Sequence, residues 1–144
     1  MKNLSRIILA AALTHLVLGA AQAAPRQAMA PKDPIATPAV QKEFEGFIAK
    51  FRAALKANDA AAVAGMTQLP FMKDSNTSDA AQFRDKVYKV DFTAKNRACL
   101  QRGKAVYQRD GLNNDNYFIF CGDKIFVFTK TPAGFLFTDI SMND

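Results

Sequence analysis

The sequence has one histidine, His15, and no tryptophan. His15 lies in an apolar segment that we expect to be removed, so the remaining chain is expected to have no histidine. Histidine is the commonest general acid–base and the commonest metal ligand. Its absence excludes Ser-His-Asp and Cys-His catalytic arrangements from the remaining chain. Metal-ligand clusters, glycine-rich phosphate loops and nucleophile elbows are also missing from the sequence, so we expect no metal and no cofactor.

The chain has no apolar run of the about 20 residues that span a bilayer. Its longest one, from Ile7 to Ala20, follows Lys2 and Arg6 and precedes the small-x-small triplet 21–23. This layout is typical of a secretory signal peptide cleaved after Ala23, with a membrane anchor as the alternative. The residue directly after the cleavage point is Ala24 and not cysteine, which argues against a lipid anchor. The sequence therefore predicts a periplasmic protein, with full secretion left open.

No block of five like charges occurs in the chain. The formal net charge is +6, and removal of Lys2 and Arg6 lowers it by two. Scattered positive residues indicate a mildly basic, solvated surface and argue against nucleic acid as a partner.

Cysteine is also scarce, since only Cys99 and Cys121 occur. An even pair in an exported chain predicts a disulfide bond, and two separate buried thiols are the alternative. The bridge would close a loop of about 23 residues, worth about 3 kcal/mol of stability. A Cys-x-x-Cys motif is absent, which argues against a redox role.

The remaining chain is predicted to be one domain after a short leader. Four prolines in residues 24–38 indicate a flexible leader, and residues 39–144 form the domain. Helices are expected over 39–57, 60–66 and 79–89. The first begins after Thr37 and Pro38, which suit the cap and the first helical position. Apolar residues at helical spacing form one core-facing stripe on it: Phe44, Phe47, Ile48, Phe51 and Leu55.

Strands are predicted from residue 98 onward, over 98–108, 116–121, 124–130 and 135–141. Gly122 and Asp123 suit a two-residue hairpin turn. The order, helices followed by a curved antiparallel meander of about four strands, is α+β. If the first hairpin centres near Asp110, Cys99 and Cys121 lie nearly opposite each other on neighbouring strands.

The strands carry large apolar side chains at consecutive positions, which leaves apolar groups on both faces of the sheet. One face packs on the helices. The other is covered by helices that enclose a pocket, by a second copy of the chain, or by a foreign protein. The candidate binding residues are Phe118, Phe120, Phe126, Phe128, Phe135, Phe137, Tyr117 and Asp139.

Asp139 is the one carboxylate placed within a predicted strand, between Thr138 and Ile140. In an apolar cavity its pKa would rise, and it could act as a base. A solvent-facing residue at the sheet edge is the alternative. Three tyrosines, Tyr88, Tyr107 and Tyr117, could donate hydrogen bonds in such a pocket.

Two segments resemble a known superfamily. The segment FEGFIAKFRAALKANDAAAVAGMTQLPF, residues 44–71, is similar to the opening of small exported proteins of the nuclear transport factor 2-like (cystatin-like cone) superfamily. GFLFTDI, residues 134–140, is similar to its final strand. The resemblance implies a cone of helices on a curved sheet. The superfamily includes enzymes that use a pocket Asp or His with Tyr partners, and many non-catalytic binders.

These patterns favour a non-enzymatic periplasmic protein that acts by protein–protein contact. One concrete form is an immunity or inhibitor protein that neutralises a toxic effector or hydrolase. An apolar small-ligand-binding cone is the alternative, and an isomerase or hydrolase that uses Asp139 is a further one. A homodimer is compatible with each.

Overall fold

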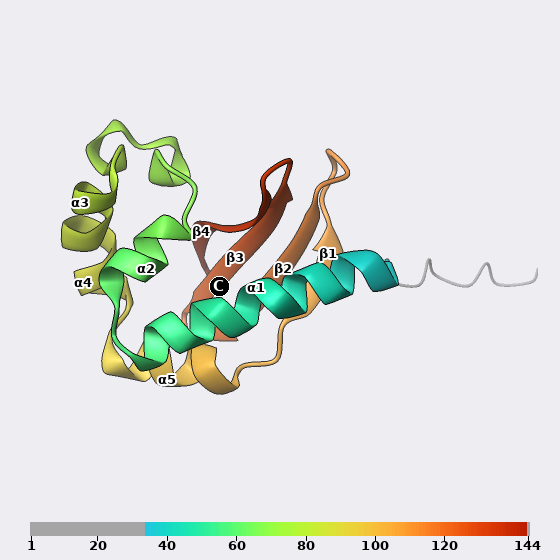
Figure 1. The fold of residues 1–144 in the computed structure, drawn as a ribbon, viewed down its shortest axis with the longest axis horizontal. Helices are drawn as coiled ribbons and strands as arrows, with labels where there is room; N and C mark the ends of the chain where they lie inside the picture. The colour runs from blue at the N-terminus through green and yellow to red at the C-terminus, as the bar shows by residue number, and fades with distance from the viewer. Residues whose placement is uncertain (1–33, 144) are drawn as a thin grey trace, which may run out of the picture. The chain divides into compact units, whose positions relative to one another are not determined.

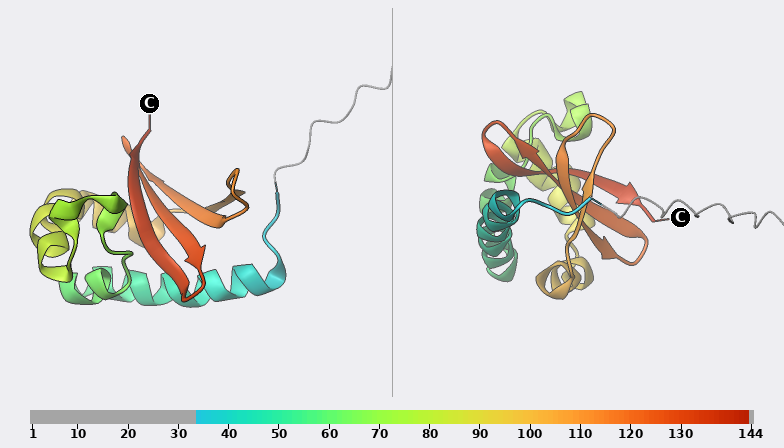
Figure 2. Two further views of the ribbon diagram at one scale, coloured as in Figure 1. Left: turned by 90° about the horizontal axis from the view of Figure 1, so that it is seen from above. Right: turned by 90° about the vertical axis from the view of Figure 1, so that its right-hand side faces the viewer.

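The structure, a computed structural model, describes residues 34–143. The predicted signal peptide and most of the predicted leader lie outside the described residues. The described chain is α+β, with helices on one face of a four-stranded antiparallel sheet in the order β1-β2-β3-β4 (Figure 1). The strands are β1 (Val106–Arg109), β2 (Asp115–Cys121), β3 (Lys124–Thr131) and β4 (Gly134–Met142). Figure 2 shows the curvature of this sheet from two further directions.

Helix α1 (Pro38–Lys56) begins as the sequence predicts. The Thr37 hydroxyl accepts a hydrogen bond from the Val40 backbone N–H, and Pro38 occupies the first helical position. The helix crosses one face of the sheet and buries its apolar stripe there (Figure 1). Phe44 stacks on Tyr117 of β2 with ring centroids 3.7 Å apart, and Phe51 meets Phe128 of β3 edge-on.

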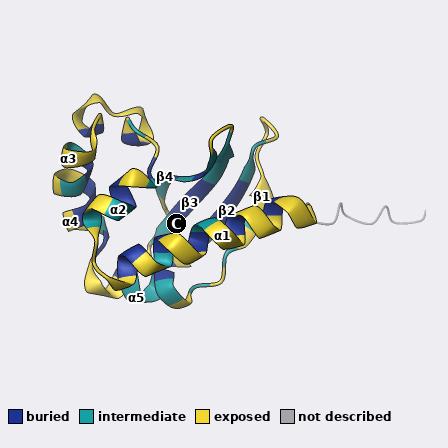
Figure 3. Ribbon diagram, viewed as in Figure 1, coloured by how far each residue is buried: buried dark blue, intermediate teal, exposed yellow. Residues whose placement is uncertain are grey.

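Shorter helices complete this side of the molecule. Helix α2 (Ala60–Gly65) corresponds to the predicted helix over 60–66, and Asp59 caps it. After the short turns η1 (Phe71–Lys73) and η2 (Ser75–Thr77), Asp79 caps a continuous helical segment. It consists of α3 (Ala80–Phe83), the π-helical stretch η3 (Arg84–Tyr88) and α4 (Lys89–Asp91). The predicted helix over 79–89 is therefore present and extends to Asp91. Figure 3 shows that α1 turns an exposed side away from the sheet.

The predicted first strand over 98–108 is wrong at its start. Residues Ala94–Arg102 form helix α5, and β1 begins only at Val106. Thr93 caps this helix by accepting from the Asn96 backbone N–H. Asn96 and Leu100 lie one helical turn apart, and both side chains are buried. Helical capping and helix-favouring residues therefore outweigh the strand pattern here.

The disulfide between Cys99 and Cys121 is present, with the Cα atoms 5.8 Å apart. It joins α5 to β2, and not two neighbouring strands as expected, because Cys99 is helical. Gly103 ends α5 where the chain passes very close to β2. A Cβ atom at this position would lie 2.5 Å from the Ile119 Cγ2, so the site has room only for glycine.

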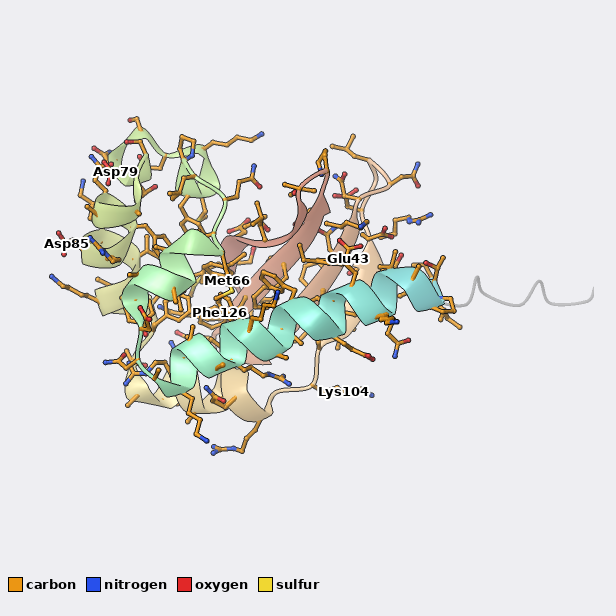
Figure 4. All side chains as sticks on the ribbon, in the orientation of Figure 1. Glu43, Met66, Asp79, Asp85, Lys104 and Phe126 are labelled. Atoms are coloured by element: carbon orange, nitrogen blue, oxygen red, sulfur yellow. A yellow bond between two sulfur atoms is a disulfide. The ribbon has the colours of Figure 1, made fainter. Side chains whose placement is uncertain are left out.

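The strand register assigns the two faces of the sheet. Gly122 and Asp123 form the predicted turn, and Gly122 takes a positive φ of 70°. On the face toward the helices lie Tyr117, Ile119, Phe126, Phe128, Phe135 and Phe137, all buried. Two ion pairs, Lys130 with Glu43 and Lys124 with Asp91, connect β3 to the helices. Figure 4 shows Phe126 between sheet and helices, whereas Lys104 points away from the body.

Candidate functional site

The candidate site is the outer face of the sheet, the face turned away from the helices. The register and the burial pattern assign these side chains to it: Val106, Gln108, Asn116, Phe118, Phe120, Ile125, Val127, Thr129, Leu136, Thr138, Asp139 and Ser141. Within the described residues, the long helix α1 packs on the opposite face, and the segment after α2, which includes η1, borders this one. The outer face divides into an apolar half and a polar half.

The apolar half contains two large side chains that are nearly half exposed. Phe120 is 47% exposed and Val106 46%. Val106 lies opposite Phe118, Phe118 opposite Val127, and Phe120 opposite Ile125. Side chains opposite each other on antiparallel strands touch, so these residues form one apolar cluster, in which Val127 is itself buried.

The polar half is the floor of a groove of roughly 520 Å³. Asn116, Thr129, Thr138 and Asp139 come from the sheet. The segment after α2 forms one wall with Gln68, Pro70, Met72 and Lys73, and Asp110 of the β1–β2 loop contributes to the lining. A hydrogen-bond pair holds the segment after α2 against the edge of β4. The Gln68 N–H donates to the Phe137 carbonyl, and the Phe137 N–H donates to the Met66 carbonyl.

Asp139 reaches the outer face because of a β-bulge in β4. Phe128 pairs with Phe137, but the next residue of β3, Val127, pairs with Asp139. Thr138 is therefore the extra residue. The bulge places Thr138 and Asp139 on the outer face, and it returns Ile140 to the side of the core, opposite Phe126.

The carboxylate of Asp139 is poorly solvated. Its Oδ1 is buried and has no hydrogen-bond partner. Burial raises the pKa of Asp139 above its usual range, against a weaker opposing effect of the Ile140 backbone N–H. Burial disfavours the ionised form, and no ion pair among the described residues includes Asp139, so Asp139 is the electrostatically unbalanced group of the groove.

The structure divides the predicted binding residues between the two faces. Asp139, Phe118 and Phe120 share the outer face. Phe126, Phe128 and Phe137 are fully buried among the helices, and Phe135 and Tyr117 are buried on the same side. Those five side chains build the core and are not part of an open surface in this structure.

The tyrosines that a catalytic Asp139 would need are not brought to it. The Tyr107 hydroxyl donates to Asp115, and the Tyr88 hydroxyl donates to Asn58. Tyr117 stacks on α1, on the opposite face of the sheet. Hydrogen bonding to the Asp115 carboxylate is the largest cause that raises the pKa of Tyr107.

Groove residues that sequence analysis missed include Asn116, Thr129, Thr138, Met72 and Lys73. Asn116 and Thr129 interrupt apolar strands at outward positions, which is a signal available in the sequence. Met72 and Lys73 carry no such signal, because their place depends on positive φ angles of 51° and 58°.

A second hollow of roughly 640 Å³ lies between α1 and β1. Its main polar groups have internal partners. The Arg52 guanidinium donates to the Leu100 and Gly103 carbonyls and so satisfies the end of α5. Tyr107 donates to Asp115 at 2.6 Å. The groove at Asp139 is therefore the stronger candidate.

Comparisons with known proteins add no assignment. No protein-family model, curated protein or solved structure matches the chain. Within residues 34–143 there is no helix with the length and apolar character needed to cross a membrane. The same residues contain no group of three or more His, Cys, Asp or Glu side chains arranged to hold a metal ion.

Proposed function

We propose that this protein is an exported, non-enzymatic binding protein that recognises another protein through the outer face of its sheet. The observation that carries the proposal is the apolar cluster of Val106, Phe118 and Phe120, in which Val106 and Phe120 are nearly half exposed. Exposed contiguous apolar patches mark interaction surfaces. Aromatic side chains at the centre of such patches contribute most of the binding energy.

Export to the periplasm is part of the proposal. The Cys99–Cys121 disulfide supports it, because such bonds persist in oxidising compartments. The order of a long helix, a short helix and an antiparallel meander supports the nuclear transport factor 2-like cone as the fold. An immunity or inhibitor protein that neutralises an effector or hydrolase is the concrete form, because that role needs a binding face and no catalytic pair.

The test is capture from a periplasmic extract, followed by affinity measurement with the captured protein. The bait is the full chain, exported and purified with its disulfide intact. We expect Phe120→Ser and Val106→Thr each to weaken binding at least about tenfold. Val90→Thr is the matched control for Val106→Thr, because Val90 is an exposed valine on α4, away from the sheet face.

Binding that is insensitive to both sheet-face variants would overturn the proposal. Sedimentation of the purified chain tests whether a second copy of the chain covers the sheet face. A stable dimer that Phe120→Ser dissociates would assign the face to a second copy, and the foreign-partner proposal would be abandoned.

A second candidate function is small-ligand binding in the groove. Its volume of roughly 520 Å³ lies within the range of small-molecule sites. Native mass spectrometry of freshly exported protein tests this candidate. A bound mass that is lost in a Val127→Asp variant would support it, and a protein that is always empty would count against it.

A further inference from the structure

The polar floor of the groove is a chain of hydrogen bonds that runs across three strands. The Asn116 side-chain amide donates to Asp110 and to the Asn114 carbonyl. The Thr129 hydroxyl donates to the Asn116 Oδ1 at 2.6 Å and lies 2.8 Å from the Thr138 hydroxyl. The Thr138 hydroxyl is also within reach of the Val127 carbonyl.

This chain of hydrogen bonds leaves no side-chain donor for Asp139, whose one donor is the Ile140 backbone N–H. A hydroxyl has a single proton. The proton of Thr129 goes to Asn116, so the proton of Thr138 goes to Thr129 or to the Val127 carbonyl. Both donors of the Asn116 amide are also in use. The side chains beside Asp139 therefore direct their protons elsewhere, and its Oδ1 stays without a partner.

The other charged groups of the groove do not balance Asp139. Asp110 has the same charge, and its own oxygens accept from Leu112, Asn114 and Asn116. Lys73 is the one cation that lines the groove, and it is exposed at the rim. None of the ion pairs among residues 34–143 includes Lys73 or Asp139.

We propose that the groove receives a basic side chain, lysine or arginine, from the partner protein, and that Asp139 is the group that pairs with it. This inference rests on the proposed function, since the same face supplies the apolar contacts. A cation beside the carboxylate compensates the charge of both oxygens, because that charge is delocalised over them. Hydrogen bonds between ionised groups are about twice as strong as neutral ones.

The arrangement also selects against other side chains. The methylene stem of lysine or arginine can lie along apolar surface while its head stays polar. Here Phe118, Val127 and Met72 line the groove beside the polar floor. An acidic side chain would meet Asp139 and Asp110 and would be repelled. The groove thus adds specificity to an apolar surface that by itself has little.

The experiment uses three small probes with the full exported chain: n-butylguanidinium, n-butylammonium and neutral n-butanol. Amide chemical shifts of residues 138–140 report binding, and the carboxyl carbon of Asp139 reports its titration. We expect both cations to shift these signals and to lower the measured pKa of Asp139. Asp139→Asn should weaken the binding of both cations about tenfold. It should change the affinity for butanol by less than about twofold.

Asp85→Asn is the matched control, because it removes the same charge from an exposed site on the helical side. It should leave all three affinities unchanged. Equal binding of butanol and the cations, or equal affinities in the wild type and Asp139→Asn, would overturn the inference. A strong rise of the measured Asp139 pKa in Lys73→Gln would also overturn it, since Lys73 would then be the counter-ion.

Failure of this inference and failure of the proposed function give different results. Partner binding that is lost in Phe120→Ser but kept in Asp139→Asn would leave the binding face intact and remove the basic anchor. Cation probes that bind at Asp139, combined with a partner insensitive to Phe120→Ser, would keep the site and reject the apolar face as the docking surface.

Discussion

Asp139 lies directly opposite Val127 in the ladder between β3 and β4, although simple alternation from Phe135 and Phe137 would turn it into the core. The extra residue Thr138 causes this change of face. An aspartate in the aromatic core would lack donors and destabilise the fold, so the bulge has a structural reason. It also gives the outer face its one unbalanced carboxylate.

The bulge predicts that two single-residue deletions in β4 lower the free energy of unfolding by different amounts. Deleting Thr138 leaves Asp139 opposite Val127 and Ile140 opposite Phe126 in a regular ladder. We expect a loss of about 1 kcal/mol from the hydroxyl hydrogen bonds. Deleting Leu136 moves Phe135 out of the core and should cost about 3 kcal/mol. Urea unfolding of both variants measures the difference, and equal losses would contradict the assigned register.

Asp139 should make stability depend on pH with a defined sign. Its folded-state pKa is raised by burial, so ionisation costs stability, and that cost appears as pH rises through its titration range. The stability of Asp139→Asn relative to the wild type should therefore increase between about pH 3 and about pH 7. Thermal unfolding across this range measures it.

Asp85→Asn is the control for that series, because Lys89 lowers the pKa of Asp85. A lowered folded-state pKa gives stability that is lost as pH falls. Asp85→Asn should therefore change in the opposite direction. If the stability of both variants relative to the wild type changed with pH in the same direction, that result would count against the burial of Asp139.

The two faces of the sheet should respond differently to removal of a phenyl ring. Phe137 is fully buried, and its ring packs against those of Phe71, Phe92 and Phe126. Phe137→Ala should cost about 3–5 kcal/mol. Phe120→Ala removes a half-exposed ring from the outer face and should cost less than about 1 kcal/mol. Chemical denaturation compares them, and a larger loss in Phe120→Ala would reverse the assignment of the faces.

The disulfide should stabilise the fold measurably. Cys99 and Cys121 are 22 positions apart, and closure of such a loop contributes about 3 kcal/mol in the chain-entropy account. The Cys99→Ala, Cys121→Ala double variant should melt about 10 °C below the oxidised wild type. Reductant should lower the melting temperature of the wild type and leave that of the double variant unchanged. A variant that melts with the oxidised wild type would show that the bridge adds nothing.

Local signals in the sequence determined much of the fold. Thr37 and Pro38 mark the start of α1, Asp59 caps α2, and Gly122 with Asp123 forms the hairpin turn. Each depends on the conformational preferences of a few neighbouring residues. The pairing of Cys99 with Cys121 followed from their number alone. The error over residues 98–102 arose because a short segment with mixed periodicity fits a helix and a strand, and the upstream cap at Thr93 favours the helix. The Arg52 guanidinium stabilises the end of that helix by donating to the Leu100 carbonyl.

Only the tertiary structure decided which aromatic residues form the core and which form the surface. The consecutive phenylalanines of β2, β3 and β4 look alike in the sequence, and the register separates Phe118 and Phe120 from the others. The groove also depends on long-range contacts, because the segment after α2 must pair with Phe137 to form its wall. The sequence by itself determined that Asp139 is a carboxylate within a predicted strand, between Thr138 and Ile140. The bulge at Thr138, which no local pattern specifies, decided that it faces the groove.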